Sequence, residues 1–102
     1  MTNAKPRRGR PPKAFVPGRH IDALLAERGA THGDYTDHAR ITQRLKSVMH
    51  EELSWYAKLT PTQRESLDMI AHKIGRILAG DPNHRDHWLD CAGYAQLVVQ
   101  RL

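Results

Sequence analysis

The chain has 102 residues and a formal net charge of +5, a length that leaves room for one domain. No apolar run approaches the ~18 residues of a membrane-spanning helix, and no apolar segment follows the basic N-terminus. The sequence therefore excludes a membrane span and a secretory signal. The single cysteine, Cys91, cannot form an internal disulfide, which fits a reducing compartment, so we expect a cytoplasmic protein.

Residues 1–19 differ in composition from the rest of the chain. They contain six of the sixteen Lys and Arg residues, four of the six prolines and no acid. Residues 20–102 are close to neutral, so the basic character belongs to the N-terminal tail. Because prolines and like charges oppose a packed core, we predict a disordered tail over 1–19 and one folded domain over 20–102.

Within the tail, Gly9-Arg10-Pro11 has basic residues on both sides. This pattern resembles an AT-hook, a short peptide that lies in the minor groove of A·T-rich DNA, where the negative potential is enhanced. The resemblance implies DNA as a partner. The implied DNA-binding residues are Arg7, Arg8, Gly9, Arg10, Pro11 and Lys13. The alternative is a solubilising tail with weak, nonspecific affinity for nucleic acid.

After the tail, apolar residues recur at helical spacing, which predicts an all-α protein. We expect a short amphipathic helix over 20–29 that ends at Gly29. Gly33 then permits a turn, and Asp34 can cap a second helix that we expect over 35–57.

A third helix has signals at both ends. Thr60 can act as its N-cap, Pro61 suits the first helical position, and Gln63 completes a capping box. Gly80 is a natural stop, so we expect this helix over 61–79.

The last helix is expected to follow a cap at Asn83. Its predicted apolar face contains Trp88, Cys91, Ala92, Ala95, Val98, Val99 and Leu102. On the opposite stripe, Gly93 would let another backbone approach, which suggests that this helix is covered on both sides. Because a chain of this size has little core, we predict a small helical bundle that a homo-oligomer completes.

Both of these later helices carry paired carboxylates away from their apolar faces. The pairs are Glu65 with Asp68, and Asp86 with Asp90. One interpretation is a solvated surface stabilised by charge pairs along each helix. The other is a site for a metal ion and phosphate. His84 and His87 lack supporting metal ligands in the sequence and are interpreted as surface residues.

Two sequence patterns carry a family resemblance. The first is Glu27-Arg28-Gly29 followed by His32-Gly33-Asp34-Tyr35. The second is Arg64-Glu65-x-Leu67-Asp68-Met69-Ile70-x-x-Lys73-Ile74-x-Arg76-Ile77, followed by Asp86-x-Trp88-x-Asp90-x-Ala92-Gly93-Tyr94-Ala95. Together they resemble a small helical family common in bacteriophages and prophages. That family is distantly similar to the MazG-like all-α nucleoside triphosphate pyrophosphohydrolases.

MazG-like enzymes hold Mg²⁺ with carboxylates from two neighbouring helices, and water attacks the triphosphate to release pyrophosphate. The resemblance implies Mg²⁺ or Mn²⁺ as cofactor and Glu65 and Asp68 as catalytic residues. The implied metal ligands are Glu65, Asp68, Asp86 and Asp90, although Asp86 and Asp90 are four residues apart instead of the family's three. The implied substrate-binding residues are Lys73, Arg76, His32, Asp34 and Tyr35.

The resulting expectation is a metal-dependent nucleoside triphosphate pyrophosphohydrolase, or a degenerate relative, that works as a homo-oligomer in the cytoplasm of a host cell. The alternative is a non-enzymatic, phage-encoded DNA-binding accessory protein, in which the tail finds DNA and the helical domain dimerises. A third possibility is an interaction module with a solvated acidic face.

Overall fold

The computed structural model describes residues 17–102, which contain five helices and no strand. In chain order the helices are α1 (Pro17–His32), α2 (Tyr35–Glu51), α3 (Ser54–Ala57), α4 (Pro61–Ala79) and α5 (Arg85–Val99). The predicted all-α class is confirmed. The AT-hook-like motif and residues 1–16 of the predicted disordered tail lie outside the described residues, and α1 begins at Pro17.

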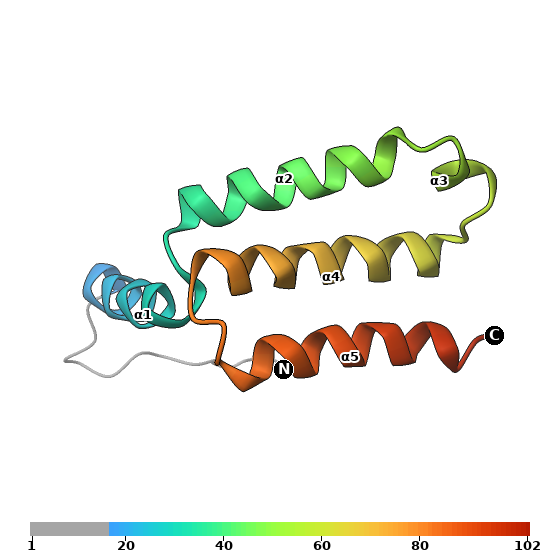
Figure 1. Cartoon of the computed structure of the whole chain (residues 1–102). Helices are drawn as coiled ribbons and strands as arrows, with labels where there is room; N and C mark the ends of the chain where they lie inside the picture. Colours follow the sequence, from blue (N-terminus) through green and yellow to red (C-terminus); the bar gives the residue numbers. More distant parts are fainter. Residues whose placement is uncertain (1–16) are drawn as a thin grey trace, which may run out of the picture.

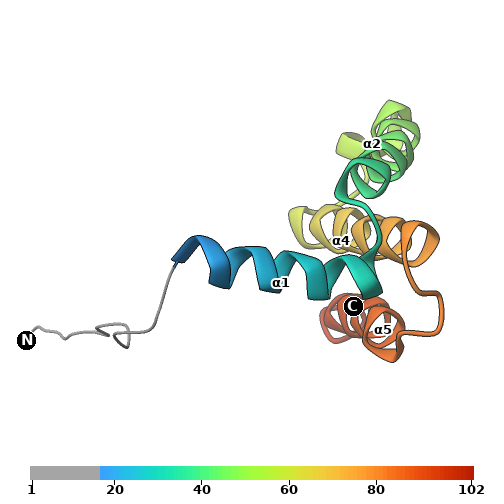
Figure 2. The same ribbon diagram turned by 90° about the vertical axis from the view of Figure 1, so that its left-hand side faces the viewer.

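Helices α2, α4 and α5 form a layer, with α4 between the other two (Figure 1). Helix α1 projects from one end of this layer, where it contacts α2 and α4 (Figure 2). One layer of helices leaves two broad faces open, so the described part of one chain does not enclose a core on its own. Residues 17–102 include no helix with the length and apolarity that membrane crossing requires.

Helix α4 has the bounds predicted from its end signals. The Gln63 N–H donates to Thr60 Oγ1 at 3.2 Å, and the Thr60 N–H donates to Gln63 Oε1 at 2.9 Å, which completes the predicted capping box. Pro61 occupies the first turn, and the Gly80 N–H closes the helix on the Arg76 carbonyl at 2.9 Å.

Helix α1 is longer than predicted because Gly29 does not end it. The helix continues to His32 and stops at Gly33, whose φ of 81° favours glycine. A Cβ on Gly33 would meet the Ala79 carbonyl and the Gly80 N–H, so this glycine is also needed where α1 meets the end of α4. Asp34 caps α2 as predicted, and its Oδ2 accepts from the Asp37 N–H at 3.2 Å.

The predicted helix over 35–57 is interrupted. Helix α2 ends at Glu51, Glu52 is extended, and the chain resumes as α3. The interruption lets Trp55 turn back against α2, where its ring lies 4.4 Å from that of His50 and is only 4% exposed. Burial of this large aromatic surface is a tertiary effect that helical periodicity does not reveal.

Helix α5 also begins differently from the prediction. His84 occupies the N-cap position without a side-chain hydrogen bond, and Asn83 is not the cap. The Asn83 N–H instead donates to Asp81 Oδ1 at 2.9 Å, within a turn that Asp81 organises. Asp86 lies in the first turn of the helix, as expected for a carboxylate near a helix N-terminus.

Apart from Trp55 on α3, the most buried side chains are small or polar rather than large and apolar. They are His38 and Thr42 on α2, Ser66, Ala71 and Lys73 on α4, and His87 on α5. Small residues on α4 let its neighbours approach closely: a Cβ on Gly75 would overlap Thr42 Oγ1. The larger apolar residues consequently line the open faces, and Leu78 and Trp88 are 65% and 56% exposed.

Two sequence interpretations of α5 are therefore corrected. His87 is not a surface residue, because it contacts Thr31 and His32 at the end of α1 and is only 2% exposed. Trp88, predicted in the core, lies on an open face. Cys91 is half-buried, and burial raises the pKa of its thiol, which agrees with a packing role instead of a nucleophilic one.

Candidate functional site

Lys73 on α4 contacts Asp90 on α5, with a distance of 3.0 Å between Nζ and Oδ2. The lysine side chain is 10% exposed and the aspartate 47% exposed, so the pair lies at the edge of the helix interface. The hydrogen bond from Lys73 lowers the pKa of Asp90, which keeps the carboxylate ionised. A predicted phosphate-binding residue and a predicted metal ligand thus bind each other.

Asp68 is directed to the other neighbour of α4. His50 Nε2 on α2 lies 2.7 Å from Asp68 Oδ1. Glu65 is exposed, and Asp86 Oδ2 lies 3.9 Å from His84 Nε2. Within residues 17–102, no three His, Cys, Asp or Glu side chains are grouped so that they could hold a metal ion. One chain therefore does not bring the four predicted metal ligands together.

A pocket of about 430 Å³ lies where α1, α2 and α4 meet. Its lining residues are Leu25, Arg28, Gly29, His32, Gly33, Asp34, Tyr35, His38, His72 and Arg76. This volume falls within the range of about 300–1,000 Å³ that is usual for small-molecule sites. We call it the α1–α4 pocket.

Histidine rings contact one another on both sides of this pocket. The His38 and His72 rings have centroids 4.5 Å apart, and His38 Nε2 donates to the His72 carbonyl at 3.2 Å. The His32 ring lies 4.9 Å from that of His87. His87 Nε2 in turn donates to the Thr31 carbonyl at 3.1 Å, which attaches the end of α1 to α5.

Burial and nearby positive charge keep the pocket histidines neutral. Burial, followed by the charge of Arg76, lowers the pKa of His32 and of His72 to about 4. Burial also lowers the pKa of His38. At neutral pH these rings are uncharged, and each can still take up a proton if a negative charge comes close.

Arg76 is the half-buried cation of the pocket. Its Nε is buried and has no hydrogen-bond partner among the described residues. Burial, with the nearby charge of Arg28, lowers the pKa of the guanidinium, while Asp90 opposes this effect. Because buried polar nitrogens in native proteins nearly always have partners, this nitrogen is suited to an acceptor from a ligand.

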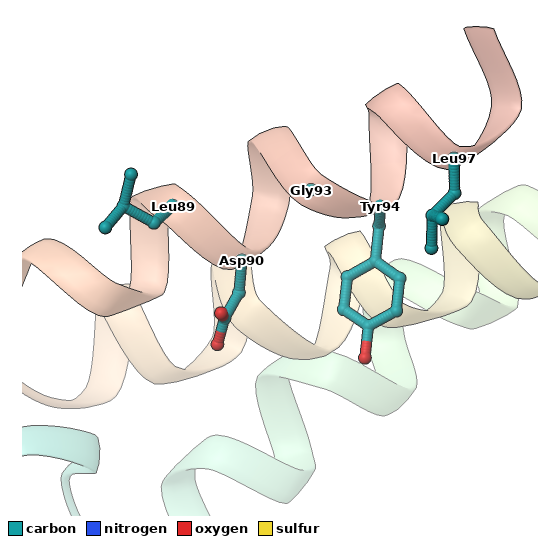
Figure 3. Close-up of a pocket in the computed structure, with 5 residues that line it drawn as sticks. All are labelled: Leu89, Asp90, Gly93, Tyr94 and Leu97. Carbon is teal, nitrogen blue, oxygen red and sulfur yellow. The ribbon is translucent and has the colours of Figure 1, made fainter. Parts of the chain in front are cut away.

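A second, more open pocket lies along α5. It is lined by Leu89, Asp90, Gly93, Tyr94 and Leu97, and the side chains of Asp90 and Tyr94 extend from the same side of the helix (Figure 3). Gly93, predicted on the stripe opposite the apolar face, thus lies in this pocket beside Asp90 and Leu97. A Cβ on Gly93 would meet no atom within 4 Å, so the space beside this glycine is open in the single chain.

A family described as a domain of unknown function (DUF6378) matches residues 20–101, which is most of the chain. The chain belongs to the DUF6378 family. Comparisons with curated proteins and with solved structures found no match. The DUF6378 match covers the whole layer and every residue of the α1–α4 pocket.

The DUF6378 domain brings several predicted substrate-binding residues together. His32, Asp34, Tyr35 and Arg76 line the α1–α4 pocket, whereas Lys73 faces Asp90. Sequence analysis assigned no role to the remaining polar lining residues, Arg28, His38 and His72. Two signals were available: Arg28 belongs to the first family motif, and His72 lies one helical turn before Arg76.

Proposed function

We propose that this DUF6378 domain binds a nucleoside triphosphate and is a MazG-like pyrophosphohydrolase, or a relative that retains substrate binding. The observation that carries the proposal is Arg76, a half-buried cation in a pocket of small-molecule size, whose Nε has no acceptor within residues 17–102. Phosphate oxygens are well suited to accept from a guanidinium.

Two cations of α4 support the same ligand class. Lys73 and Arg76 are three residues apart, on neighbouring positions of the helix surface. Lys73 is held by Asp90, and the charge of Asp90 also acts on Arg76, so one carboxylate influences both cations. Fixed cations of this kind stabilise the negative charge that develops on phosphate oxygens during hydrolysis.

The metal implied by the MazG-like resemblance does not fit the described residues of one chain. Asp68 is bound by His50 and Asp90 by Lys73, and no group of three metal-binding side chains is formed in residues 17–102. A homo-oligomer is therefore part of the proposal. The exposed apolar residues of the layer, among them Leu78, Trp88 and Val99, favour a second copy.

The test of catalysis is incubation of the purified protein with Mg²⁺ and each nucleoside triphosphate in turn, followed by detection of pyrophosphate. We expect release of pyrophosphate from one or a few nucleotides, and a loss of at least about tenfold in Arg76→Gln if a charged hydrogen bond to phosphate is removed. Arg44→Gln removes the same charge from an exposed position on α2 and should leave the rate unchanged. No pyrophosphate from any nucleotide would remove the enzymatic part of the proposal.

Metal binding has a separate test in the melting curve. A cation that binds only the folded oligomer raises the melting midpoint. At a cation concentration 100 times the dissociation constant, it adds about 2.7 kcal/mol to the free energy of unfolding. Millimolar Mg²⁺ or Mn²⁺ should stabilise the parent and not Asp68→Asn. If neither metal shifts the midpoint, with or without a nonhydrolysable nucleotide, metal-dependent hydrolysis is the wrong function.

DNA binding is the second candidate, and the sequence Gly9-Arg10-Pro11 with its basic neighbours favours it. We propose it as a role of the tail, in a protein whose helical domain dimerises. Both functions can belong to one protein, since a DNA-binding tail would keep a nucleotide-binding domain close to replicating DNA.

A further inference from the structure

Two arginines from different helices line the α1–α4 pocket. Arg28 comes from α1 and Arg76 from α4, and the charge of Arg28 is one cause of the lowered pKa of Arg76. The positive charges of these two arginines therefore repel each other. Among the lining residues only Asp34 carries a carboxylate, and its Oδ2 is already bound to the Asp37 N–H at the start of α2.

The groups that face the pocket histidines are almost all cationic or become so on protonation. His32 experiences Arg28 from its own helix, Arg76 from α4, and His84 and His87 at the start of α5. His72 experiences Arg76 and Lys73 from α4 and, from α2, His38 and Lys46. Tyr35 also lines the pocket, and its ring lies 6.0 Å from that of His38.

We propose that the α1–α4 pocket holds the phosphate groups of its ligand between Arg28 and Arg76, and that His32 and His72 take up protons when it does so. The inference rests on the proposed function for the identity of the ligand, a small phosphate compound. An anion placed between the arginines removes their repulsion and supplies an acceptor for Arg76 Nε. It also stabilises the protonated form of each neighbouring imidazole.

The pocket suits a small compound better than a DNA strand. Its volume is about 430 Å³, and it is bounded on three sides by α1, α2 and α4. Proteins that bind DNA phosphates without base contacts use extended basic surfaces. The phosphates of a nucleotide suit an enclosed pocket of this kind. Most residues of α1 are exposed, and a phosphate bound in the pocket would join this helix to the layer.

The experiment is an NMR titration of the histidine rings with sodium pyrophosphate, in the absence of divalent metal. His32→Gln and His72→Gln variants assign the two signals. We expect the pKa of both rings to rise from about 4 towards 6.5 or above as pyrophosphate saturates the protein. A nonhydrolysable nucleoside triphosphate should displace the pyrophosphate, whereas a DNA duplex should not.

Two arginine variants and one control complete the test. Arg76→Gln and Arg28→Gln should each weaken pyrophosphate binding by about tenfold or more, as expected for loss of a charge-assisted hydrogen bond. Arg44→Gln should bind like the parent. Because Arg28 is exposed, its variant keeps the test decisive even if Arg76→Gln fails to fold.

The outcomes separate this site from the proposed function. If neither ring responds to pyrophosphate, or if both arginine variants bind as the parent does, the pocket is not a phosphate site. In that case pyrophosphate release in the catalytic assay would still stand. If pyrophosphate binds and raises both pKa values but no nucleotide is hydrolysed, the phosphate site is correct and the enzymatic proposal is wrong.

Discussion

Lys73 Nζ lies 3.0 Å from Asp90 Oδ2, yet the two side chains differ greatly in exposure, 10% against 47%. The lysine side chain is largely buried, whereas the aspartate side chain stays in contact with water. Such a pair is asymmetric, because removal of the exposed partner leaves a charge without compensation in the interface between α4 and α5.

Asp90→Asn should therefore destabilise the fold more than Lys73→Met. We expect a loss of about 1–3 kcal/mol in the free energy of unfolding for Asp90→Asn, since the lysine is then unpaired. Lys73→Met keeps the buried aliphatic stem and leaves an exposed carboxylate, so its effect should be smaller. Urea unfolding of both variants and of the double variant measures the difference. Equal losses in the two single variants would contradict the asymmetry.

Gly75→Ala should be strongly destabilising although alanine favours helices. The added Cβ would overlap Thr42 Oγ1 and lie 2.7 Å from His38 Cδ2, so α2 would have to move away from α4. Overpacking of this kind costs about 1–3 kcal/mol. Thermal unfolding measures it.

Gly93→Ala is the matched control for Gly75→Ala. A Cβ at Gly93 meets nothing within 4 Å, so the variant should gain up to about 1 kcal/mol from helix propensity. If Gly93→Ala instead loses stability, another surface must lie against this glycine, as a second copy of the chain would.

The fold should lose stability as the pH falls from 6.5 towards 4. In the unfolded chain His32 and His72 bind protons near pH 6.5, whereas in the folded chain they do so only near pH 4. Between these values the unfolded state binds more protons, so acid favours unfolding, by at most about 1.4 kcal/mol per pH unit for each histidine. Urea unfolding at a series of pH values measures this slope. The double variant His32→Gln, His72→Gln should flatten it, and an unchanged slope would assign the acid sensitivity elsewhere.

Arg10 should decide any preference of the tail for A·T-rich DNA. An arginine between glycine and proline can enter the minor groove, whereas Lys13 is expected to contact phosphates. Arg10→Ala should bring the affinities for A·T-rich and G·C-rich duplexes together, and Lys13→Ala should weaken both equally. Fluorescence anisotropy with the two duplexes measures this. Equal affinities for the unmodified protein would mean that the tail is a nonspecific cation.

The part of the fold that sequence predicted best is the part with local signals. Thr60, Pro61, Gln63 and Gly80 set the ends of α4, and each acts through atoms within a few residues. The interruption after α2 had no such signal. It depends on the packing of Trp55 on α3 against His50 on α2, and the sequence pattern predicted these two segments as one helix.

The site was predicted incompletely for a related reason. His87 looked like a surface residue because nothing near it in the sequence resembles a partner, and its partner is the carbonyl of Thr31. His38 and His72 likewise meet only because α2 packs on α4 through Gly75. The family resemblance implied roles for Arg76 and the His32–Tyr35 turn, but the motifs could not show that these residues line one pocket.

The hydrogen bond from His87 to Thr31 joins positions 56 residues apart, and this separation matters while the protein is being made. A ribosome synthesises every lining residue of the α1–α4 pocket, from Leu25 to Arg76, before it reaches His87. A nascent chain released early would therefore carry the complete set of pocket residues without the bond that fastens the end of α1. Helix α5 adds no residue to the α1–α4 pocket, but its synthesis is required before the hydrogen bond that fastens the end of α1 can form.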